Sequence, residues 1–234
     1  MKRLCLLGKQ YDDTIMIVNS LKQGETNDCA ALRQKKGGVY NFFEAKMDKW
    51  ILNPLTCGIK KAYIISNKET STRTSIVVDE EKSTISFEEV QRINNYFDWM
   101  HVCYIDDMEC YSELRDIEIP FSLDFCTDKP RAPFFYLLNR AEIVFDSRER
   151  KYLYDNIFIN TPIIFHDESG FEVVVDGSIV HSESITPLKN LNVNGAGDIY
   201  AGRFLEHYLE KLDAFRSAKL AAEDTTNLLL QRKD

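Results

Sequence analysis

The sequence has no apolar run long enough to cross a bilayer, which takes about 20 consecutive apolar residues. Positive charge is also scarce: 29 Lys and Arg stand against 37 Asp and Glu, giving a formal net charge of −8. General binding to nucleic acid or to an anionic membrane surface requires a positive field, so we expect neither as a partner. A small anionic ligand stays compatible with this composition, because it needs only a few local hydrogen-bond donors.

Paired metal-ligand motifs are missing from the sequence as well. The six cysteines form no Cys-x-x-Cys pair, and the four histidines share no metal-ligand spacing. Residues 1–8 reach glycine and charged side chains too early for an export signal. We therefore expect a cytoplasmic protein with reduced, mostly buried thiols and no metal ion held directly by a ligand cluster; a disulfide or a structural zinc is the alternative.

Short runs of β-branched and aromatic residues alternate with helical patterns along the chain. Most of these runs are continuously apolar, which is typical of parallel strands covered on both faces. The alternation predicts one doubly wound α/β domain over residues 1–234, with a mostly parallel central sheet and helices on both faces. The expected strands are 3–7, 62–66, 101–105, 121–125, 143–145 and 163–166, and the expected helices are 41–52, 87–99, 133–140 and two after residue 201.

Other stretches alternate apolar and polar residues at period two, namely 14–18 and 72–79 with 83–87. This pattern is typical of half-exposed strands, and we interpret it as a small β lid built from about 14–34 and 72–87. An antiparallel extension of the sheet edge gives the same pattern and stays open. Pairing of the lid strands with a second copy, and so a homodimer, is a further hypothesis. Near the end of the chain, Asp176-Gly177 between two strand patterns predicts a hairpin.

The motif that carries chemistry is Gly195-Ala196-Gly197-Asp198, just before a strong helical pattern. Small residues leave the amide N–H groups of the first helical turn open, and with the positive end of the helix dipole they make an anion site. A carboxylate in the same turn can reach a hydroxyl held beside that anion. Phosphoryl transfer needs this pairing of donors and a proton acceptor. The structural alternative is a glycine-rich helix start with an ordinary first-turn acid.

Residues 192–205 resemble the signature of the ribokinase-like (PfkB) carbohydrate kinases. The family pattern is Asp-Thr-x-Gly-Ala-Gly-Asp and a helix containing Ala-Gly, and this chain has Asn-Val-Asn-Gly-Ala-Gly-Asp followed by Ala201-Gly202. The resemblance implies that Asp198 is the catalytic base and that the three residues before it form the anion hole. It also implies ATP and Mg²⁺ as cofactors and a sugar or sugar derivative as the acceptor.

Weaker matches to the same family follow in the family's order along the chain. Gly8 and the sugar-binding Asp13 resemble its first strand, and Gly24-Glu25-Thr26 resembles a turn that often follows. A glycine pair and an asparagine resemble the N-terminal signature that contacts the sugar. The resemblance therefore implies four substrate-binding residues: Asp13, Gly37, Gly38 and Asn41.

Two more matches lie in the second half of the chain. Residues 122–125, with Lys129 and Arg131, resemble the mid-chain aspartate strand of fructoselysine-type kinases, in which Asp124 is the aspartate. Residues 164–170 lie where the family has a strand and a glycine-containing turn over the nucleotide, which implies a nucleotide contact at Gly170.

The chain also departs from the family pattern. Asn192 and Val193 replace the Asp and Thr that lie near the phosphates and the metal. The family's Asn-x-x-Glu motif, which organises magnesium through water, aligns with residues 147–150. Either Glu149 supplies its carboxylate one place out of register, or Arg148 or Arg150 meets phosphate directly.

The chain is also short for the family. Residues 41–72 leave room for a single helix and strand, and residues that complete the adenine pocket are missing after residue 230. A reduced kinase and an inactive descendant are both compatible with these departures, and retention of the base favours the active one.

Three functional hypotheses follow. The first is ATP-dependent, magnesium-requiring phosphoryl transfer to a hydroxyl, most simply a hydroxymethyl group, of a sugar or sugar derivative. The second keeps this chemistry with a nucleoside or a vitamin-like alcohol as the acceptor, stacked on Tyr11, Tyr40 or Phe42. The third is a non-catalytic sugar- or nucleotide-binding relative, which Asn192, Val193 and the altered segment 147–150 favour.

Overall fold

The structure is a computed structural model that describes residues 1–70, 72–78, 84–105, 111–126, 136–155, 157–187, 193–211 and 213–232. Its strands are β1 (Lys2–Val18), β2 (Cys29–Gly38), β3 (Trp50–Asn67), β4 (Thr72–Val78), β5 (Trp99–Cys103), β6 (Phe121–Asp124), β7 (Ile143–Ser147), β8 (Ile163–Asp167), β9 (Gly170–Val175) and β10 (Ser178–Ser184). Its helices are the 3₁₀ segments η1 (Val39–Ala45) and η2 (Arg148–Tyr154) and the α-helices α1 (Phe87–Tyr96), α2 (Tyr111–Leu114), α4 (Ala196–Tyr208) and α5 (Ala214–Leu230).

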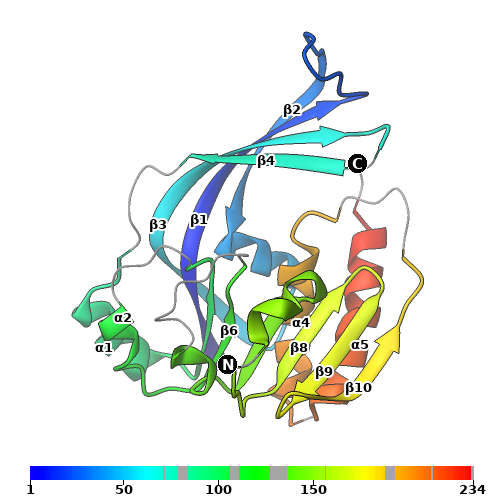
Figure 1. Ribbon diagram of the computed structural model, residues 1–234. Helices are drawn as coiled ribbons and strands as arrows, with labels where there is room; N and C mark the ends of the chain where they lie inside the picture. Colours follow the sequence, from blue (N-terminus) through cyan, green and yellow to red (C-terminus); the bar gives the residue numbers. More distant parts are fainter. Residues whose placement is uncertain are drawn as a thin grey trace.

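Ten strands of the described residues form one sheet, in the order β10-β9-β8-β7-β6-β5-β1-β3-β4, with β2 paired to β1. The series β3-β1-β5-β6-β7-β8 is parallel, and β2, β4, β9 and β10 pair antiparallel. All six expected strands are present, so the predicted doubly wound, mostly parallel sheet is confirmed (Figure 1). The hairpin at Asp176-Gly177 and the two helices after residue 201 are confirmed too.

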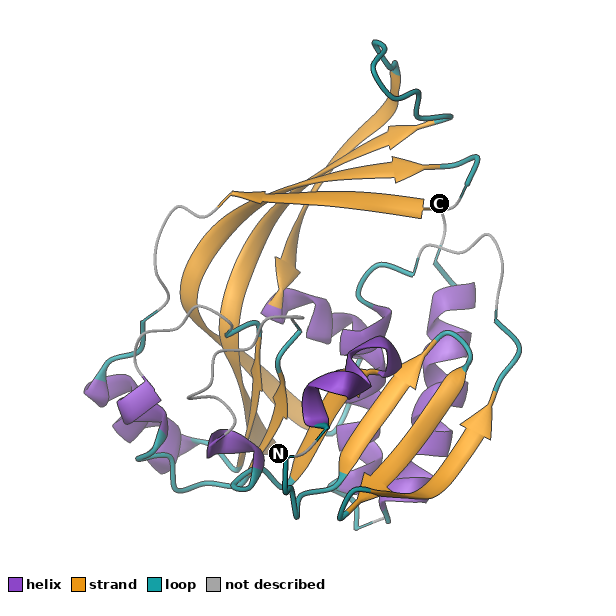
Figure 2. Cartoon of the chain, viewed as in Figure 1, coloured by secondary structure: helices purple, strands orange, loops and turns teal. Residues whose placement is uncertain are grey.

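Helices cover both faces of the central sheet (Figure 2). η1, α4 and α5 pack on one face, and α1 and α2 pack on the other. Side chains of β1 alternate between the two cores: Leu4 and Leu6 belong to the first, Cys5 and Leu7 to the second, and all four are fully buried. A strand with both faces covered needs apolar residues at every position, which explains its continuous apolar run. None of the helices in the described part of the chain is long and apolar enough to cross a membrane.

Strands β1 and β3 continue far beyond the central sheet. They pair in parallel from Lys2 and Trp50 to Val18 and Asn67. β5 pairs only with the first half of β1, up to Gly8, and β2 pairs with the second half. The outer halves of β1 and β3 therefore form, with β2 and β4, a four-stranded extension that rises from the body (Figure 1). We call this extension the lid sheet; closure over a ligand stays a prediction.

Gly8 lies at the junction between the central sheet and the lid sheet. The register of β1 against β3 shifts just after it. A Cβ atom at Gly8 would lie 1.9 Å from the carbonyl oxygen of Cys103 in β5, so only glycine allows the two strands to approach this closely. The first half of β1 is thereby held against β5, and its second half is left to the lid.

Two expected elements are wrong in extent. The helix expected over 41–52 ends at Ala45, because Lys46 adopts a left-handed conformation (φ 51°) and β3 pairs with β1 from Trp50 onward. The strand expected over 83–87 is replaced by a loop at 84–86 and the start of α1, because Ser86 and Glu89 form a capping box.

Some of the expected features lie outside the described residues, namely positions 79–83 of the lid pattern together with Lys129 and Arg131. Of the helix expected over 133–140, only 136–140 are described, with a helical turn at 136–138.

Candidate active site

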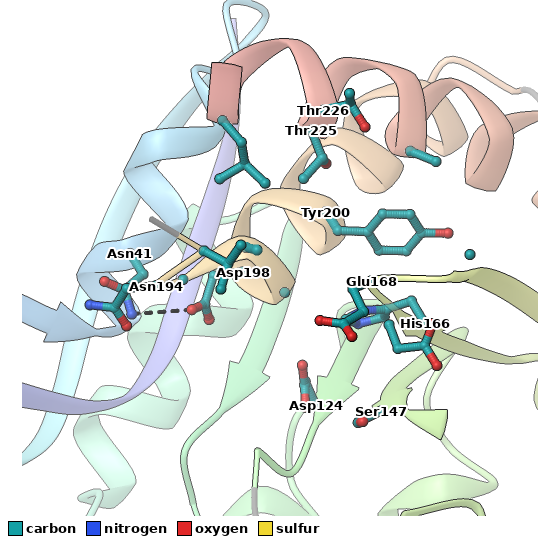
Figure 3. Close-up of a pocket in the computed structure, with 18 of the residues that line it drawn as sticks. Asn41, Asp124, Ser147, His166, Glu168, Asn194, Asp198, Tyr200, Thr225 and Thr226 are labelled. Atoms are coloured by element: carbon teal, nitrogen blue, oxygen red, sulfur yellow. Dashed lines mark hydrogen bonds between the residues drawn. The ribbon is translucent and has the colours of Figure 1, made fainter. Parts of the chain in front are cut away.

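The order of the strands reverses at β1: the chain crosses from β1 to β3 on one side, whereas β5 lies on the other. In doubly wound sheets, ligands bind outside the carboxyl ends of the strands at such a reversal. Here the ends of β5, β6, β7 and β8 lead to Tyr104, Asp124, Ser147 and His166, and all four line one cavity of about 470 Å³. Figure 3 labels the last three of these residues in the lining. This volume lies within the range of about 300–1,000 Å³ that is typical of small-molecule sites.

Helix α4 begins at the same cavity. Gly195, its N-cap, has a left-handed conformation (φ 73°). A Cβ atom at Gly195 would lie 3.2 Å from the side chain of Asn41, and one at Gly197 would lie 3.2 Å from Cε1 of His166. The backbone of the loop therefore packs directly against η1 and β8, which explains why both positions are glycine.

Asp198 lies in the first turn of α4 and is only 6% exposed. The Tyr104 hydroxyl donates to its carboxylate, at 2.8 Å from Oδ2 and 3.0 Å from Oδ1. Nδ2 of Asn41 donates to Oδ2 at 3.1 Å (Figure 3). The ammonium group of Lys35 on β2 donates in turn to Oδ1 of Asn41, at 3.3 Å. Two residues from separate segments, Tyr104 and Asn41, thus donate to one carboxylate, and Lys35 supports the second of them.

Burial raises the pKa of Asp198 to about 7, and the neighbouring carboxylate of Asp124 adds to the shift. The hydrogen bonds from Tyr104 and Asn41, with the charge of Lys35, oppose it. A carboxyl group with this pKa is partly ionised at neutral pH, so it can both take up and release a proton. Such a group is suited to general acid–base chemistry.

A second acidic cluster lies at the floor of the cavity. Asp146 on β7 is fully buried, where it accepts from the side chain of Arg150 and, at 2.6 Å, from the hydroxyl of Tyr154. Burial raises the pKa of Asp124 on β6, and the charge of Asp146 adds to this shift while Arg150 opposes it. Arg150 also lines the cavity, so its charge faces both the buried acids and any ligand.

The part of the cavity that α4 and α5 line is largely apolar. Tyr200, Ala222 and Leu229 contribute to it. His166 and Thr225 also line the cavity, and the buried atoms Nε2 of His166 and Oγ1 of Thr225 have no hydrogen-bond partner among the described residues. Buried polar atoms are normally paired.

Comparison with known proteins gives a result at the level of structure alone. No family model matches the sequence, and no curated protein sequence matches it. Solved structures do match over nearly the whole chain. The nucleoside kinase of Methanocaldococcus jannaschii, an archaeal member of the ribokinase family, superposes with a TM-score of 0.75 at 14% identity, covering 99% of this chain and 93% of the kinase.

Two further structures agree with the first. Arabidopsis thaliana ribokinase, complexed with ribose and ATP, has a TM-score of 0.72 at 14% identity, with 100% of this chain and 94% of the ribokinase covered. A microbiome-derived acarbose kinase has a TM-score of 0.72 at 15% identity, with 96% and 92% covered. The chain has the ribokinase-like fold. The superpositions establish the arrangement of the helices and strands. At identities this low they do not indicate which substrate this chain binds.

Within the ribokinase-like fold, the four predicted sugar-binding residues fall into two places. Asn41 lines the cavity and contacts Asp198, as described above. Asp13 on β1 lies against β2, so that a Cβ atom at Gly37 would lie 2.3 Å from Oδ2 of Asp13. Gly38 has φ 62° and leads directly into η1, which carries Asn41. The lid sheet thus holds three of the four residues beside the cavity rather than within its lining.

The predicted nucleotide-binding residues are also divided. Gly170 lines the cavity. Arg148 does not line it: its guanidinium donates to Ser169 at 3.0 Å and is paired with Asp167 of β8 and Glu172 of β9. Glu149 is exposed and likewise outside the lining, so Ser147 and Arg150 are the residues of segment 147–150 that reach the cavity. Asn192 lies outside the described residues.

The predicted anion hole is partly closed by its own loop. The amide of Ala196 donates to the carbonyl of Val193 at 3.0 Å, whereas Gly195, Ala196 and Gly197 all line the cavity. Arg232, which follows α5, also contacts this loop: its guanidinium donates to the carbonyl of Asn194 at 2.8 Å. Any use of the Ala196 amide by an anion requires this short turn to open.

Sequence reasoning missed Tyr104 and Thr225 as site residues. Tyr104 directly follows a strand at the point where the strand order reverses, which is a signal that a strand-order prediction could have used. Thr225 sits in the middle of α5 with no local signal. Phe42, predicted as a stacking candidate, is fully buried in the core and cannot stack on a ligand.

Proposed function

We propose that the protein is an ATP-dependent kinase that transfers a phosphoryl group to a hydroxyl, most simply a hydroxymethyl group, of a sugar or sugar derivative. The observation that carries the proposal is the buried carboxylate of Asp198, with its pKa near 7, in the first turn of a glycine-opened helix that faces a cavity. The ribokinase-like fold supports the assignment, since the neighbours reported above are named as sugar or nucleoside kinases.

Asp198 is the general base in this proposal. Its ionised form accepts the proton of the attacking hydroxyl as the oxygen forms its bond to phosphorus and the bond to the leaving ADP breaks. Asn41 holds the carboxylate from one side at 3.1 Å, which fixes its direction. The backbone at Gly195 and Gly197, with the positive end of the α4 dipole, stabilises negative charge on the transferred group.

The cavity suits a nucleotide in size and in chemistry. The apolar part next to α5, with Tyr200, Ala222 and Leu229, accepts a flat nucleobase. At the other end, Arg150 supplies positive charge for phosphate oxygens. Gly170, at φ 136°, lies in the same lining and carries no side chain that would obstruct a ligand.

The donor set of the cavity also fits Mg²⁺. Four acids line the cavity, namely Asp124, Asp167, Glu168 and Asp198. Among the described lining residues, Arg150 is the single arginine. Such an excess of acid would repel a triphosphate unless a cation were bound with it, and Mg²⁺ prefers carboxylate oxygens and water. Asp124 and Glu168 would hold the ion, directly or through water. When bound, it supplies charge neutralisation and orientation of the phosphate oxygens.

The acceptor is placed on the lid side of Asp198. Asp13 and Asn41 offer hydroxyl-binding groups there, and Gly37 and Gly38 let the carboxylate of Asp13 and the ring of Tyr11 pack closely against their backbone. A nucleoside is the second candidate acceptor, because two aromatic rings lie next to the general base Asp198. The rings of Tyr11 and Tyr104 meet edge to face there, with centroids 5.6 Å apart. This pair presents an aromatic surface of the kind that stacks on bases.

The lid sheet also supports the proposal of a homodimer. Leu32, Tyr63, Ile76 and Val78 are exposed by 40–63% on its strands. Register places Tyr63 opposite Ile76 in neighbouring strands, so part of this apolar surface is contiguous. Size-exclusion chromatography with light scattering tests it, and a mass near 27.1 kDa would contradict a dimer. We also retain the cytoplasm as the proposed location.

The decisive experiment measures ATP consumption with Mg²⁺ against a panel of sugars, sugar derivatives and nucleosides. We expect one acceptor class to support turnover and Asp198→Asn to lower it about 10²- to 10⁴-fold, the usual contribution of a general base. Asp176→Asn is the matched control, since Asp176 lies in the β9–β10 turn away from the cavity. Near-wild-type turnover by Asp198→Asn would contradict the mechanism. Thermal stabilisation by sugar alone, with no effect of Mg²⁺ and ATP, would instead favour a non-catalytic binder.

A further inference from the structure

The base of the proposed reaction already has a hydrogen-bond donor in place. The hydroxyl of Tyr104 lies 2.8 and 3.0 Å from the two carboxylate oxygens of Asp198. An attacking hydroxyl must itself come within about 2.6–3.2 Å of a general base. The phenol therefore stands at the distance from Asp198 at which the hydroxyl of an acceptor would stand, and the two compete for the same oxygen atoms.

Tyr104 is held in this position by a strained backbone. Its φ is 54°, a left-handed conformation that is a rare outlier for a bulky residue other than glycine or asparagine. Strain of this kind persists only where the surroundings fix it, and it clusters at functional sites. The hydrogen bonds to Asp198 and the ring contact with Tyr11 are the interactions that fix it.

Tyr104 also connects the base to the lid sheet. Its ring meets the ring of Tyr11 on β1, and Tyr11 pairs with Gly37 on β2. The ring of Tyr11 closes over Gly38 as well, where an added Cβ atom would lie 2.8 Å from its Cδ2. These are the lid residues assigned to the acceptor above. An acceptor bound there would press on Tyr11 and, through it, on Tyr104.

We propose that Tyr104 is a positioning residue that occupies Asp198 until an acceptor displaces it, so that bound ATP is not hydrolysed by water in the acceptor-free site. The proposal rests on the kinase function proposed above. The phenol donates to both carboxylate oxygens, beside the amide of Asn41, and a water molecule cannot take the place of the phenol to be deprotonated. Burial raises the pKa of Tyr104 well above its ordinary value, so the phenol stays a donor at neutral pH.

The first test is the rate of ATP hydrolysis by Tyr104→Phe with Mg²⁺ and no acceptor. The substitution keeps the ring and its packing and removes only the hydroxyl. We expect hydrolysis to rise at least about 10-fold over wild type, which is less than the about 10²- to 10⁴-fold that a general base usually supplies. Tyr208→Phe is the matched control: Tyr208 lies on α4, stacks on Phe204 and is not part of the cavity, so its hydrolysis rate should equal that of wild type. An unchanged or lower rate in Tyr104→Phe overturns the proposal.

The second test needs no turnover. The carboxyl carbon of Asp198 is followed by ¹³C NMR against pH in the nucleotide-free protein, and its signal is assigned by its loss in Asp198→Asn. The groups that act on this carboxyl are Tyr104, Asn41, Lys35 from β2, Asp124 from β6 and the thiols of Cys103 and Cys126, whose own pKa values burial raises. Because the phenol stabilises the ionised form, Tyr104→Phe should raise the pKa of Asp198, and Tyr208→Phe should leave it unchanged. A pKa that does not move in Tyr104→Phe overturns the proposal.

Measurements on the wild-type protein, namely thermal stabilisation by Mg²⁺ and ATP and turnover of an acceptor, separate failure of this inference from failure of the kinase assignment. A wild-type protein that shows no thermal stabilisation by Mg²⁺ and ATP, and no turnover with any acceptor, refutes the kinase, and with it the claim that Tyr104 restrains hydrolysis. A wild-type protein that turns over an acceptor, with equal acceptor-free hydrolysis in Tyr104→Phe, keeps the kinase and refutes the inference.

Discussion

Replacing Asp198 by asparagine should make the protein more stable at alkaline pH while it removes activity. The folded protein holds this carboxyl group at a pKa of about 7, against an ordinary value of 3.8, chiefly because the group is buried. An acid with a raised pKa binds its proton more tightly in the folded state than in the unfolded state. Stability therefore falls as the pH rises from about 4 towards 7 and stays at its lower level above that.

The size of the effect follows from the width of this window. Each unit of pKa difference corresponds to about 1.4 kcal/mol, so the two units between pH 5 and pH 7 give a loss of about 3 kcal/mol in the free energy of unfolding. Asp198 is only 6% exposed, so solvent screening reduces this little. The amide that replaces the carboxyl group in the variant does not titrate. Its changed hydrogen bonds with Tyr104 and Asn41 contribute about equally at both pH values and cancel in the comparison.

The measurement is urea denaturation of wild type and Asp198→Asn at pH 5 and pH 8, with the free energy of unfolding extrapolated to water. We subtract the free energy of unfolding of the wild type from that of the variant at each pH. This difference should be about 3 kcal/mol larger at pH 8 than at pH 5. Asp176→Asn, in an exposed turn, should show no such change between the two pH values. A difference that is the same at both pH values would refute the claim that folding holds Asp198 at a raised pKa.

Three further substitutions test the packing around the site. Gly195→Ala should destabilise by about 1–2 kcal/mol, because φ is 73° there, and should weaken the thermal stabilisation by Mg²⁺ and ATP; an unchanged nucleotide response would count against the loop as the phosphate site. Gly202→Ala should cost about 1–3 kcal/mol in urea denaturation, because its Cβ atom would lie 2.5 Å from that of Ala45, and adding Ala45→Gly should restore much of the loss. Arg150→Gln should cost about 3–5 kcal/mol at pH 8, because it leaves the buried charge of Asp146 unpaired; a loss below about 1 kcal/mol would show that another group neutralises that acid.

The parts of the fold that could be predicted are those that depend on the residues of one segment alone. The apolar runs of β5 to β8 predict buried strands, and the glycines at the start of α4 predict an anion site, without reference to any other segment. The prediction was wrong where partners decided the outcome. Trp50–Leu52 fits a helical pattern, yet β1 offers these residues a full ladder of strand hydrogen bonds, and the ladder prevailed.

The sequence by itself therefore determined the class of the fold and pointed to the proposed base, because periodicity and a short motif are local properties of the chain. Tertiary structure alone decided what surrounds that base. Tyr104 and Asp124 are far from Asp198 in the sequence and lie near it because the ends of parallel strands converge at one edge of the sheet, whereas Asn41 reaches it from η1, which packs against α4. The raised pKa of Asp198 and the phenol that occupies it arise from burial and distance, which no single segment encodes.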